Sequence, residues 1–583
     1  MQQIKSTKKI GTVEDSPVKN ADTIFHTLNK MKIYRIGQFF NSVKRCGVDV
    51  SDVLMLLLMM PFYHIKSVPL VVKSGLSGMQ SVACSNSVFY DLKNNPKVSW
   101  RSLLYLVSLR FKTLAHKLNP EAITKIRAFI FDDSPLSKSG IKTELVSRMY
   151  DHVSCSYIFG YKILVLGYWD GLSFYPIDFS LHREKGSQVN DLKQRLDTAN
   201  KRLRIQRQKV KEIEQTLATA WQTLRLVKKE NKGKQTKSAT KQIVQVTATV
   251  KRTANRLEKS KVKYADLENK AIELRSELKQ TKRKHPDYGL TKKQIGQQFK
   301  KQRDPQTPGK QREAEADIKK TTNMMSMLKR AVKRGFQADY VLTDSWHFNI
   351  ELVKLVSKLS KKHCINLISL ARIGITKYNL VSNNRTYNAA ELLVKLERKA
   401  ITARSHNSKY IKVPVTYGGI RINLFFVKMG KSTKWKLLAT TDLTINFQKI
   451  MNVYQIRWSI EIFFRESKQY LNLGKCKSTS FDAQIADATI NLTQYTLLAF
   501  HQRICEYSSF YGIFSAALED AMQHNIAAKL QEMFWLVLEI FCDFAGVDVF
   551  DFIETLVTDE KAYLKFQQLN PVFDECLYKH RAA

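Results

Sequence analysis

The sequence predicts an α/β protein with a mixed sheet, because strand-like runs, a hairpin signal and a helical stretch follow one another along it. Two of the apolar runs end in aspartate, AFIFDD at 128–133 and ADYVLTD at 338–344. Between them, Asp170-Gly171 separates two strand-like segments, and Asp-Gly is a strong signal for a hairpin turn. After the second run, a helical stretch at 347–361 leads into the strand-like CINLISLA. Strands and helices in this order are typical of a sheet that is covered by helices.

Helical and β-rich segments flank this pattern. Residues 30–120 read as helices with polar breaks and could contain a DNA-binding module, although no helix-turn-helix signature is clear. The segment at 409–441 predicts a β-meander with turns at Gly418-Gly419 and near Gly430. After a helix at 450–473, the remaining residues are mostly helical and apolar.

The net charge indicates a polyanionic partner. Against 52 acidic side chains stand 95 basic ones, which leaves a formal charge of +43. Duplex DNA carries about one negative charge per 1.7 Å of its axis and is the natural partner for such a chain. Membrane headgroups are the rival, but no amphipathic basic terminus favours them. On charge alone, an RNA-binding role stays open.

Cysteine spacing and hydropathy exclude several other classes. The eight cysteines are scattered without zinc-ligand spacing, so neither a disulfide framework nor a zinc site is indicated. The apolar run at 53–63 is too short to span a bilayer, and the run at 533–546 contains two acidic residues. No signal peptide is visible. We therefore expect a soluble, cytoplasmic protein of roughly two or three domains.

A heptad pattern interrupts the α/β region. Apolar residues recur at alternating spacings of three and four from Val189 to Val227, and again from Ile243 to Leu278. The polar stretch KKENKGKQTKSATK separates the two arms, which predicts an antiparallel coiled-coil hairpin about 55–60 Å long. An intermolecular coiled coil is the alternative. The arms are rich in lysine and arginine, which could touch DNA or form a solvated basic face.

A stripe of polar residues runs along the helix that begins YQIRWSIEIFFRESKQY. Tyr454, Arg457, Glu461 and Lys468 fall at i, i+3, i+7 and i+14. At about 100° per residue, all four lie within an arc of roughly 60°. Opposite charges at helical spacing often only decorate a solvated face, and that is the alternative for this stripe taken alone.

Three carboxylates stand on these predicted elements: Asp132 or Asp133 after the first strand, Asp344 after a later strand, and Glu461 on the helix. Aspartate after a strand is also a common turn residue. Together, however, the three match what phosphodiester cleavage by two metal ions needs, namely carboxylates converging on ions about 3.5–4 Å apart. Mg²⁺ takes oxygen ligands of this kind.

This order of residues resembles the RNase H-like DDE transposases. More narrowly, Tyr454-x2-Arg457-x3-Glu461-x6-Lys468 resembles the YREK signature of the insertion-sequence-four family of bacterial transposases. VLTDSWHF resembles the motif of the second aspartate in that family, and FIFDDSPLSKSG the motif of the first. The resemblance covers roughly residues 85–475.

The resemblance implies a DNA transposase that cuts transposon ends and joins them to target DNA, in a cut-and-paste reaction through hairpin ends. It implies two Mg²⁺ ions, for which Mn²⁺ can substitute, held by Asp132, Asp344 and Glu461. Tyr454, Arg457 and Lys468 would grip the phosphates of the terminal inverted repeats. A homodimer on double-stranded DNA, associated with the bacterial nucleoid, is the implied complex.

Two assignments within this resemblance need a choice. A tryptophan of the β-rich insertion would stack on a flipped base, and Trp435 lies in the matching region, although a core or strand-edge tryptophan is the alternative. Strand side chains alternate in direction, so only one of Asp132 and Asp133 can face the metal. The family pattern favours Asp132, with Asp133 leaning away toward an expected turn at 134–138.

The chain then divides into eight expected segments: a helical N-terminal, DNA-binding region at 1–120; RNase H-like core parts at 121–185, 336–375 and 446–480; a coiled-coil hairpin at 186–285; a basic linker or arm at 286–335; a β-rich insertion at 376–445; and a helical C-terminal region at 481–583.

Two other functions remain open. A non-catalytic, architectural nucleic-acid-binding protein would suit the charge and the coiled coil, but it would leave the three carboxylates unexplained. A transposon-derived nuclease that cuts without transposing would use the same residues. Metal-dependent cleavage of terminal inverted repeats separates the architectural protein from the enzyme.

Overall fold

The computed structural model describes residues 24–44, 47–63, 65, 67–73, 85–151, 153–184, 187–232, 237–284, 287–430 and 432–505, and short runs between 537 and 552. Contacts divide the chain into two compact units. The first consists of Met1–Leu92, Thr113–Ala115 and Thr493–Ala583, and the second of Lys93–Lys112 and His116–Leu492. Most of the predicted C-terminal region, including part of the apolar run at 533–546, lies outside the described residues.

The first unit is helical in its described part, with α1 (Ile24–Lys30), α2 (Ile33–Gln38), α3 (Val50–Met59), α4 (Val68–Lys73), most of α5 (Asn86–Asn94) and the second half of α16 (Phe481–Cys505). All of α3 except Asp52 is buried, as its run of Val, Leu and Met dictates. Gln494 on α16 donates hydrogen bonds to the carbonyl oxygens of Leu57 and Leu58, at 3.2 Å each, and so caps the end of α3. None of the described helices is both long and apolar enough to cross a membrane.

The second unit contains a twelve-stranded sheet with the order β2-β3-β1-β5-β6-β12-β11-β10-β7-β8, while β4 pairs with β3 and β9 with β10. β1 is antiparallel to β3 and parallel to β5, and β5 is parallel to β6. The strands in chain order are β1 (Ala128–Lys138), β2 (Ser147–Asp151), β3 (Ser156–Trp169), β4 (Phe174–His182), β5 (Tyr340–Thr343), β6 (Asn366–Ala371), β7 (Lys377–Leu380), β8 (Thr386–Asn388), β9 (Ile401–Ala403), β10 (Ser408–Tyr417), β11 (Ile420–Met429) and β12 (Lys436–Thr440).

The hairpin turns form where the glycines predict them. Asp170 accepts hydrogen bonds from the backbone N–H groups of Leu172 and Ser173 and so stabilises the turn between β3 and β4. Gly418 and Gly419, with φ of 57° and 86°, join β10 to β11, which is the backbone geometry that a two-residue hairpin loop requires. The expected β-rich segment at 376–445 thus contains β7 to β12.

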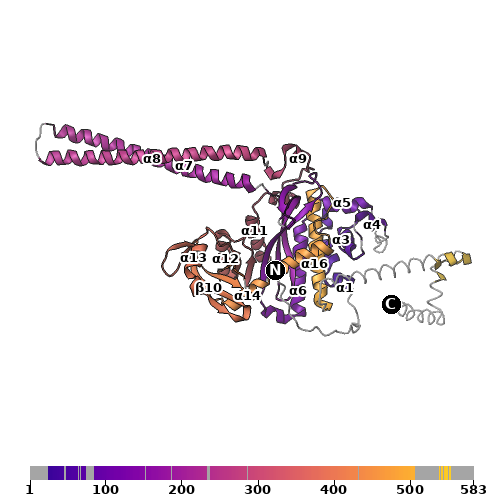
Figure 1. Cartoon of the computed structure of the whole chain (residues 1–583). Helices are drawn as coiled ribbons and strands as arrows, with labels where there is room; N and C mark the ends of the chain where they lie inside the picture. Colours follow the sequence, from indigo (N-terminus) through magenta and orange to yellow (C-terminus); the bar gives the residue numbers. More distant parts are fainter. Residues whose placement is uncertain are drawn as a thin grey trace. The chain divides into compact units, whose positions relative to one another are not determined.

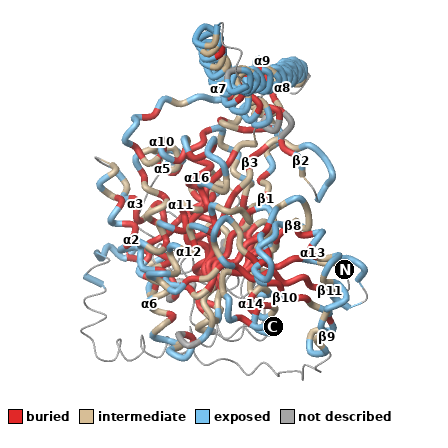
Figure 2. The backbone as a smooth tube through the Cα atoms, turned by 90° about the vertical axis from the view of Figure 1, so that its left-hand side faces the viewer, coloured by how far each residue is buried: buried red, intermediate tan, exposed pale blue. Residues whose placement is uncertain are grey.

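Helices cover this sheet. In Figure 2 the strands are the most buried part of the second unit. Besides two long helices between Ser187 and Lys284, the described α-helices of the second unit are α6 (Trp100–Leu118), α9 (Lys292–Gly296), α10 (Pro308–Glu315), α11 (Lys320–Lys333), α12 (Ile350–His363), α13 (Ala389–Leu396), α14 (Phe447–Gln455), α15 (Trp458–Tyr470) and the first half of α16. The first four residues of β1, Ala128–Phe131, are fully buried, because a central strand has a packed layer on each face.

The segment 286–335, for which the composition predicts a basic linker or arm, contains α9, α10 and α11. Met324, Met327, Leu328 and Ala331 follow i, i+3, i+4, i+7 spacing and are buried where α11 packs against β3 and β4. The segment contains many lysines, so its composition alone does not reveal this apolar stripe. α11 is therefore one of the helices that pack on the sheet.

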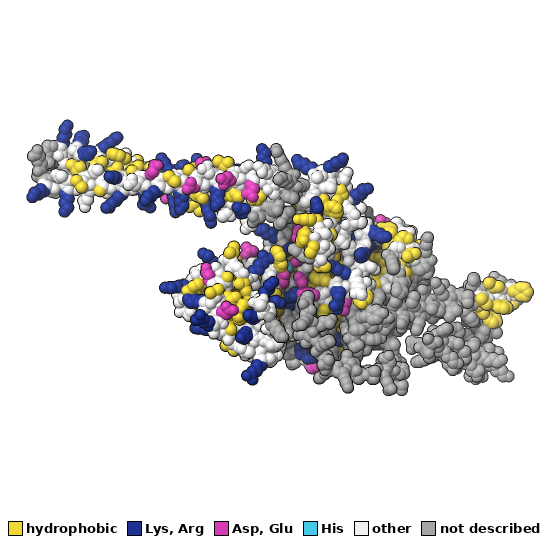
Figure 3. All heavy atoms as spheres, viewed as in Figure 1, with side chains coloured by type: hydrophobic (Ala, Val, Ile, Leu, Met, Phe, Trp, Pro, Cys, Tyr) yellow, Lys and Arg dark blue, Asp and Glu magenta, His cyan; other side chains and the backbone are white. Residues whose placement is uncertain are grey.

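Two long helices, α7 (Ser187–Glu230) and α8 (Lys237–Lys284), lie side by side (Figure 1). Leu192 and Ala199, near the start of α7, pack with Ala271 and Leu274, near the end of α8, so the pair is antiparallel. Midway, Gln206 donates hydrogen bonds to the Oγ and the carbonyl oxygen of Ser260, at 2.8 and 3.0 Å. Figure 3 shows lysine and arginine side chains along the whole length of the pair.

We expect the isolated segment 187–284 to be helical and monomeric at micromolar concentration. Leu274→Ala should then lower its free energy of unfolding by about 2–3 kcal/mol, because Leu274 is 5% exposed in the contact between the helices. Ile272→Ala is the matched control, with a cost under about 0.5 kcal/mol, since Ile272 is 55% exposed. Denaturation followed by circular dichroism measures both, and a segment without helical signal would contradict the expectation.

Candidate active site

The sheet register brings two of the predicted carboxylates to the same level. Ala128, Phe129 and Ile130 of β1 pair in parallel with Tyr340, Val341 and Leu342 of β5. Continued by two residues, this register places Asp132 opposite Asp344, which directly follows β5. Neighbouring strands lie about 4.8 Å apart, so the two carboxylates come from adjacent backbones.

β1 does not end at its aspartates, as the hydrophobic run predicts, but continues through Lys138. The expected turn at 134–138 is therefore absent. The reason is pairing along the whole strand, since β3 accompanies β1 from Trp169 back to Phe159. Asp132 and Asp133 thus lie in mid-strand, with side chains that alternate across the sheet.

The stripe of Tyr454, Arg457, Glu461 and Lys468 faces the sheet. The expected single helix at 450–473 is divided into α14 and α15, but Ile456 and Arg457 between them keep right-handed helical dihedral angles. The phase of the stripe is therefore retained across the break. In this position the stripe contacts β1 and β5, and it is not a solvated face.

Arg457 joins the third carboxylate to the first. Its Nη1 lies 3.4 Å from Oδ2 of Asp132, and its Nη2 donates to Oε1 of Glu461 at 2.5 Å. The hydroxyl of Tyr454 donates to the carbonyl oxygen of Thr343, the residue before Asp344, at 3.2 Å. These contacts bring α14 and α15 to the middle of β1 and to the end of β5.

Lys468, about two helical turns beyond Glu461, also contacts β1. Its Nζ donates a hydrogen bond to Oγ of Ser134 at 2.7 Å, two residues beyond Asp132. Burial lowers the pKa of Lys468. A buried ammonium group that bonds only to a hydroxyl keeps the capacity to bind an anion.

The two adjacent aspartates have opposite electrostatic environments. Burial raises the pKa of Asp132 to about 6, and Arg457 opposes this while Asp344 adds to it. Burial also acts on Asp133, but Lys320 and His347 outweigh it and lower the pKa of Asp133. The Nζ of Lys320, on α11, lies 2.8 Å from Oδ2 of Asp133. Asp133 is thus already paired, whereas Asp132 faces the other carboxylates.

His347 is a functional candidate that sequence reasoning missed. It is 2% exposed, and its Nδ1 donates to Oδ1 of Asp344 at 2.6 Å, while its Nε2 lies 4.0 Å from Asp133. Burial opposes ionisation of Asp344, but this hydrogen bond lowers its pKa. In the sequence, the position of His347 three residues after Asp344 is the feature that could have identified it. For Lys320 no local signal existed, because it lies 187 residues from Asp133.

Two tryptophans differ in their relation to the site. Trp346, two residues after Asp344, is 68% exposed, and the guanidinium of Arg372 lies 3.9 Å from its ring centroid. Trp435, just before β12, donates its indole N–H to Glu397 at 3.1 Å. The contacts of Trp435 lie within the β-rich segment. Trp346 was quoted in the sequence motif but was given no role there.

The donor set has the chemistry of a hard cation site. Three carboxylates supply oxygen ligands, and a bound cation would stabilise the charged form of Asp132, whose pKa is raised first by burial and then by Asp344. Within the described part of the chain, however, no three acidic, histidine or cysteine side chains stand close enough together to hold a metal. Arg457 lies between Asp132 and Glu461 and pairs with both, so a metal ion held by these carboxylates would take the place of its guanidinium group.

Comparison with protein families gives an independent observation about this region. Residues 310–497 match the model of the Transposase DDE domain, which supports a DDE transposase and with it DNA binding. The match contains Asp344 and the stripe from Tyr454 to Lys468 but begins after Asp132. No curated protein matches the chain.

We expect Asp132→Asn to raise the melting temperature at pH 7 in EDTA, and Asp133→Asn to lower it. The raised pKa of Asp132, about 6, means that its charge destabilises the fold at pH 7. The lowered pKa of Asp133 means that its charge stabilises the fold, an effect that is lost as the pH falls through the folded-state pKa. The free energies of unfolding should differ by at least about 1 kcal/mol between the variants. Identical melting curves would contradict the assignment of environments.

Proposed function

We propose that the protein is a DNA transposase of the insertion-sequence-four kind, which cuts transposon ends and joins them to target DNA in a cut-and-paste reaction through hairpin ends. The observation that carries this proposal is the bridge made by Arg457. It joins Asp132 to Glu461, 329 positions further along the chain (461 − 132), while the register sets Asp344 beside Asp132.

The sheet topology supports an RNase H-like core. β4, β3 and β1 are successive antiparallel neighbours, and β5 and β6 then continue the sheet parallel to β1. In such a core, the first aspartate lies on the central strand and the second follows the adjacent parallel strand. Asp132 and Asp344 occupy these two positions.

Asp132, Asp344 and Glu461 would hold two Mg²⁺ ions, for which Mn²⁺ can substitute. When bound, the ions supply activation of the attacking oxygen and stabilisation of the leaving oxygen in an in-line displacement. The chain fixes the geometry around them. His347 orients the Asp344 carboxylate, and Lys320 holds Asp133 away from the other carboxylates.

The cations of the stripe would bind phosphates of the transposon end. Arg457 would exchange its carboxylate partners for a phosphate, which also opens the space between Asp132 and Glu461. Lys468 would exchange its bond to Ser134 in the same way, while Tyr454 keeps the helix at the end of β5. The stripe then serves both to stabilise the free site and to receive DNA.

A base lifted from the duplex needs an exposed aromatic face. Trp435 is the position that the resemblance implies, and Trp346 is a second candidate because it is exposed beside Asp344. The Arg372 guanidinium on the Trp346 ring would add a cation to the same surface. The partners in this proposal are terminal inverted repeats, target DNA and a second copy of the chain, in the bacterial cytoplasm.

We expect Asp344→Ala, Glu461→Ala and Asp132→Asn each to reduce metal-dependent cleavage of terminal inverted repeats roughly 10²-fold or more, because each removes a charge that acts in the transition state. End binding in gel-shift assays should stay close to that of the wild type. Asp133→Asn is the matched control and should retain a measurable fraction of cleavage, since Asp133 is paired with Lys320. Wild-type rates in the first three variants would refute the assignment of the active site. Strand-transfer products in the same assay separate a transposase from a nuclease that only cuts.

We expect Lys468→Ala and Arg457→Ala to weaken binding to transposon ends and to flatten its salt dependence. Each lost phosphate contact should reduce the log–log slope by about one unit. Lys361→Ala, at an exposed position in the last turn of α12, is the matched control for loss of charge. Slopes equal to that of the control would mean that the two stripe cations do not touch phosphate.

A further inference from the structure

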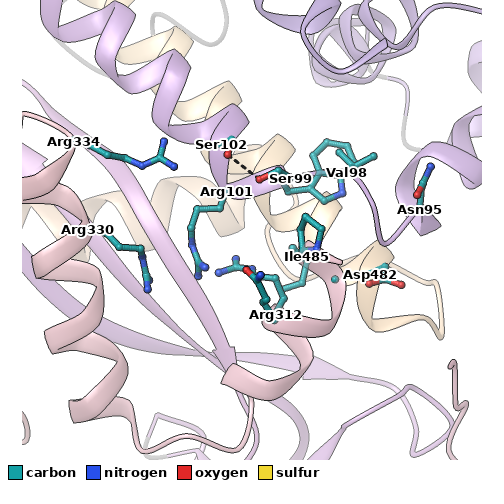
Figure 4. Close-up of a pocket in the computed structure, with 14 residues that line it drawn as sticks. Asn95, Val98, Ser99, Arg101, Ser102, Arg312, Arg330, Arg334, Asp482 and Ile485 are labelled. Atoms are coloured by element: carbon teal, nitrogen blue, oxygen red, sulfur yellow. Dashed lines mark hydrogen bonds between the residues drawn. The ribbon is translucent and has the colours of Figure 1, made fainter. Parts of the chain in front are cut away.

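A basic pocket lies in the second unit, away from the three carboxylates. Its volume is about 220 Å³, and the first turns of α6 and α10, the end of α11 and the start of α16 line it. Figure 4 shows its arginines gathered on one side, with Val98 and Ile485 on the other. The four arginines are Arg101 from α6, Arg312 from α10, and Arg330 and Arg334 from α11.

Arg312 is buried at this pocket, and two of its guanidinium nitrogens have no hydrogen-bond acceptor. It is 5% exposed, and its Nη1 donates to the carbonyl oxygen of Phe179 at 2.6 Å and to Glu315 at 3.1 Å. Its Nε and Nη2 are buried without any hydrogen-bond partner. The indole N–H of Trp100, which also lines the pocket, is in the same state. Buried donors left unpaired are costly, so three of them at one pocket indicate a missing acceptor.

The ion pairs around the pocket do not neutralise all of its positive charge. Arg101 and Arg330 share Asp178, at 2.9 Å each, and Arg101 and Arg312 share Glu315, at 2.7 and 3.1 Å. Two carboxylates therefore face three guanidinium groups before Arg334 is counted.

Arg334 adds a fourth cation, which lies over the ring of Tyr105 at 4.4 Å and has no carboxylate partner among the described residues. The one acidic residue in the lining, Asp482, already binds Arg303 and Lys301, at 3.0 and 3.1 Å. Burial and the neighbouring Arg101 lower the pKa of Arg312 to about 10. An anion in the pocket would offset both effects.

We propose that this pocket binds a phosphate group, supplied either by a DNA backbone or by a free phosphate-bearing small molecule. Guanidinium groups present parallel N–H donors that match phosphate oxygens, and Arg312 has Nε and Nη2 available for such a contact. The first turns of two helices add positive potential at the same place.

The pocket is distinct from the proposed catalytic site. It is built from α6, α10, α11 and α16, whereas the carboxylates lie on β1, after β5 and on α15. α11 connects the two regions, with Lys320 beside Asp133 in its first turn and Arg330 ten residues on, about 15 Å along the axis. Phosphate binding here therefore does not depend on the metal or on cleavage.

Titration calorimetry of the full chain with pyrophosphate, in EDTA at constant ionic strength, tests the proposal directly. We expect saturable binding, weakened roughly tenfold by Arg334→Gln and abolished by Arg312→Gln. Lys333→Gln removes an equal charge from an exposed neighbouring position on α11 and should leave the affinity unchanged. Arg334 is exposed, so its variant keeps the test valid if Arg312→Gln does not fold. Asp344→Ala should bind pyrophosphate as the wild type does, which separates this site from the proposed active site.

A second set of binding measurements, with duplex DNA, identifies the source of the phosphate. If a DNA backbone supplies it, Arg334→Gln should reduce the salt slope of duplex binding by about one unit, and pyrophosphate should compete. If a free molecule supplies it, the variant should lose pyrophosphate binding alone and bind the duplex normally. Arg334→Gln and Lys333→Gln that match the wild type in both sets of measurements would overturn the proposal.

Discussion

Repulsion between buried carboxylates is the constraint around which the site is organised. The parallel register of β1 and β5 sets Asp132 beside Asp344, and burial makes their charges costly. Arg457 offsets this cost from one direction and His347 from another, so the cations and hydrogen-bond donors of the site are needed even without DNA. A phosphate backbone that enters the site would meet cations that are already directed toward it, and the exchange of partners by Arg457 would couple DNA binding to the opening of the carboxylate cluster.

The same constraint explains why the two adjacent aspartates differ. A mid-strand position forces their side chains to opposite faces, and only the face toward α15 carries Arg457. On the other face, α11 supplies Lys320, which pairs with Asp133. α11 thus has a structural and an electrostatic task, with buried methionines on one side and lysine at its start. One face of this strand holds a carboxylate beside Arg457, and the other face holds a carboxylate that is paired with Lys320.

The sequence predicted the parts of the fold that depend on local patterns. Short-range sequence patterns are sufficient to predict the hairpin turns at Asp170-Gly171 and Gly418-Gly419 and the two heptad arms. It predicted the carboxylates through their positions on strands and a helix. It could not predict where β1 ends, because β3 sets that length through pairing. Nor could it predict the ion pair of Lys320 with Asp133 or those of Arg303 with Glu144 and Asp482, because these partners lie 159 to 187 residues away. The role of His347 needed the side-chain geometry at Asp344.

Two buried arginines of the second unit differ in how many of their buried guanidinium nitrogens lack a hydrogen-bond partner, which is two in Arg312 and none in Arg303. Arg303 is also buried, yet each of its three guanidinium nitrogens has a partner: Nε bonds to Asp482, Nη1 to Glu144 and Glu313, and Nη2 to Glu144. The chain therefore surrounds Arg303 with carboxylates and leaves Arg312, nine residues further on, with two unpaired donors at the lining of the pocket. Arg101, Arg312 and Arg330 share only the carboxylates of Asp178 and Glu315 among the described residues. An acceptor from outside the chain accounts for this difference, since an arginine with only structural duties would be more stable with the environment of Arg303.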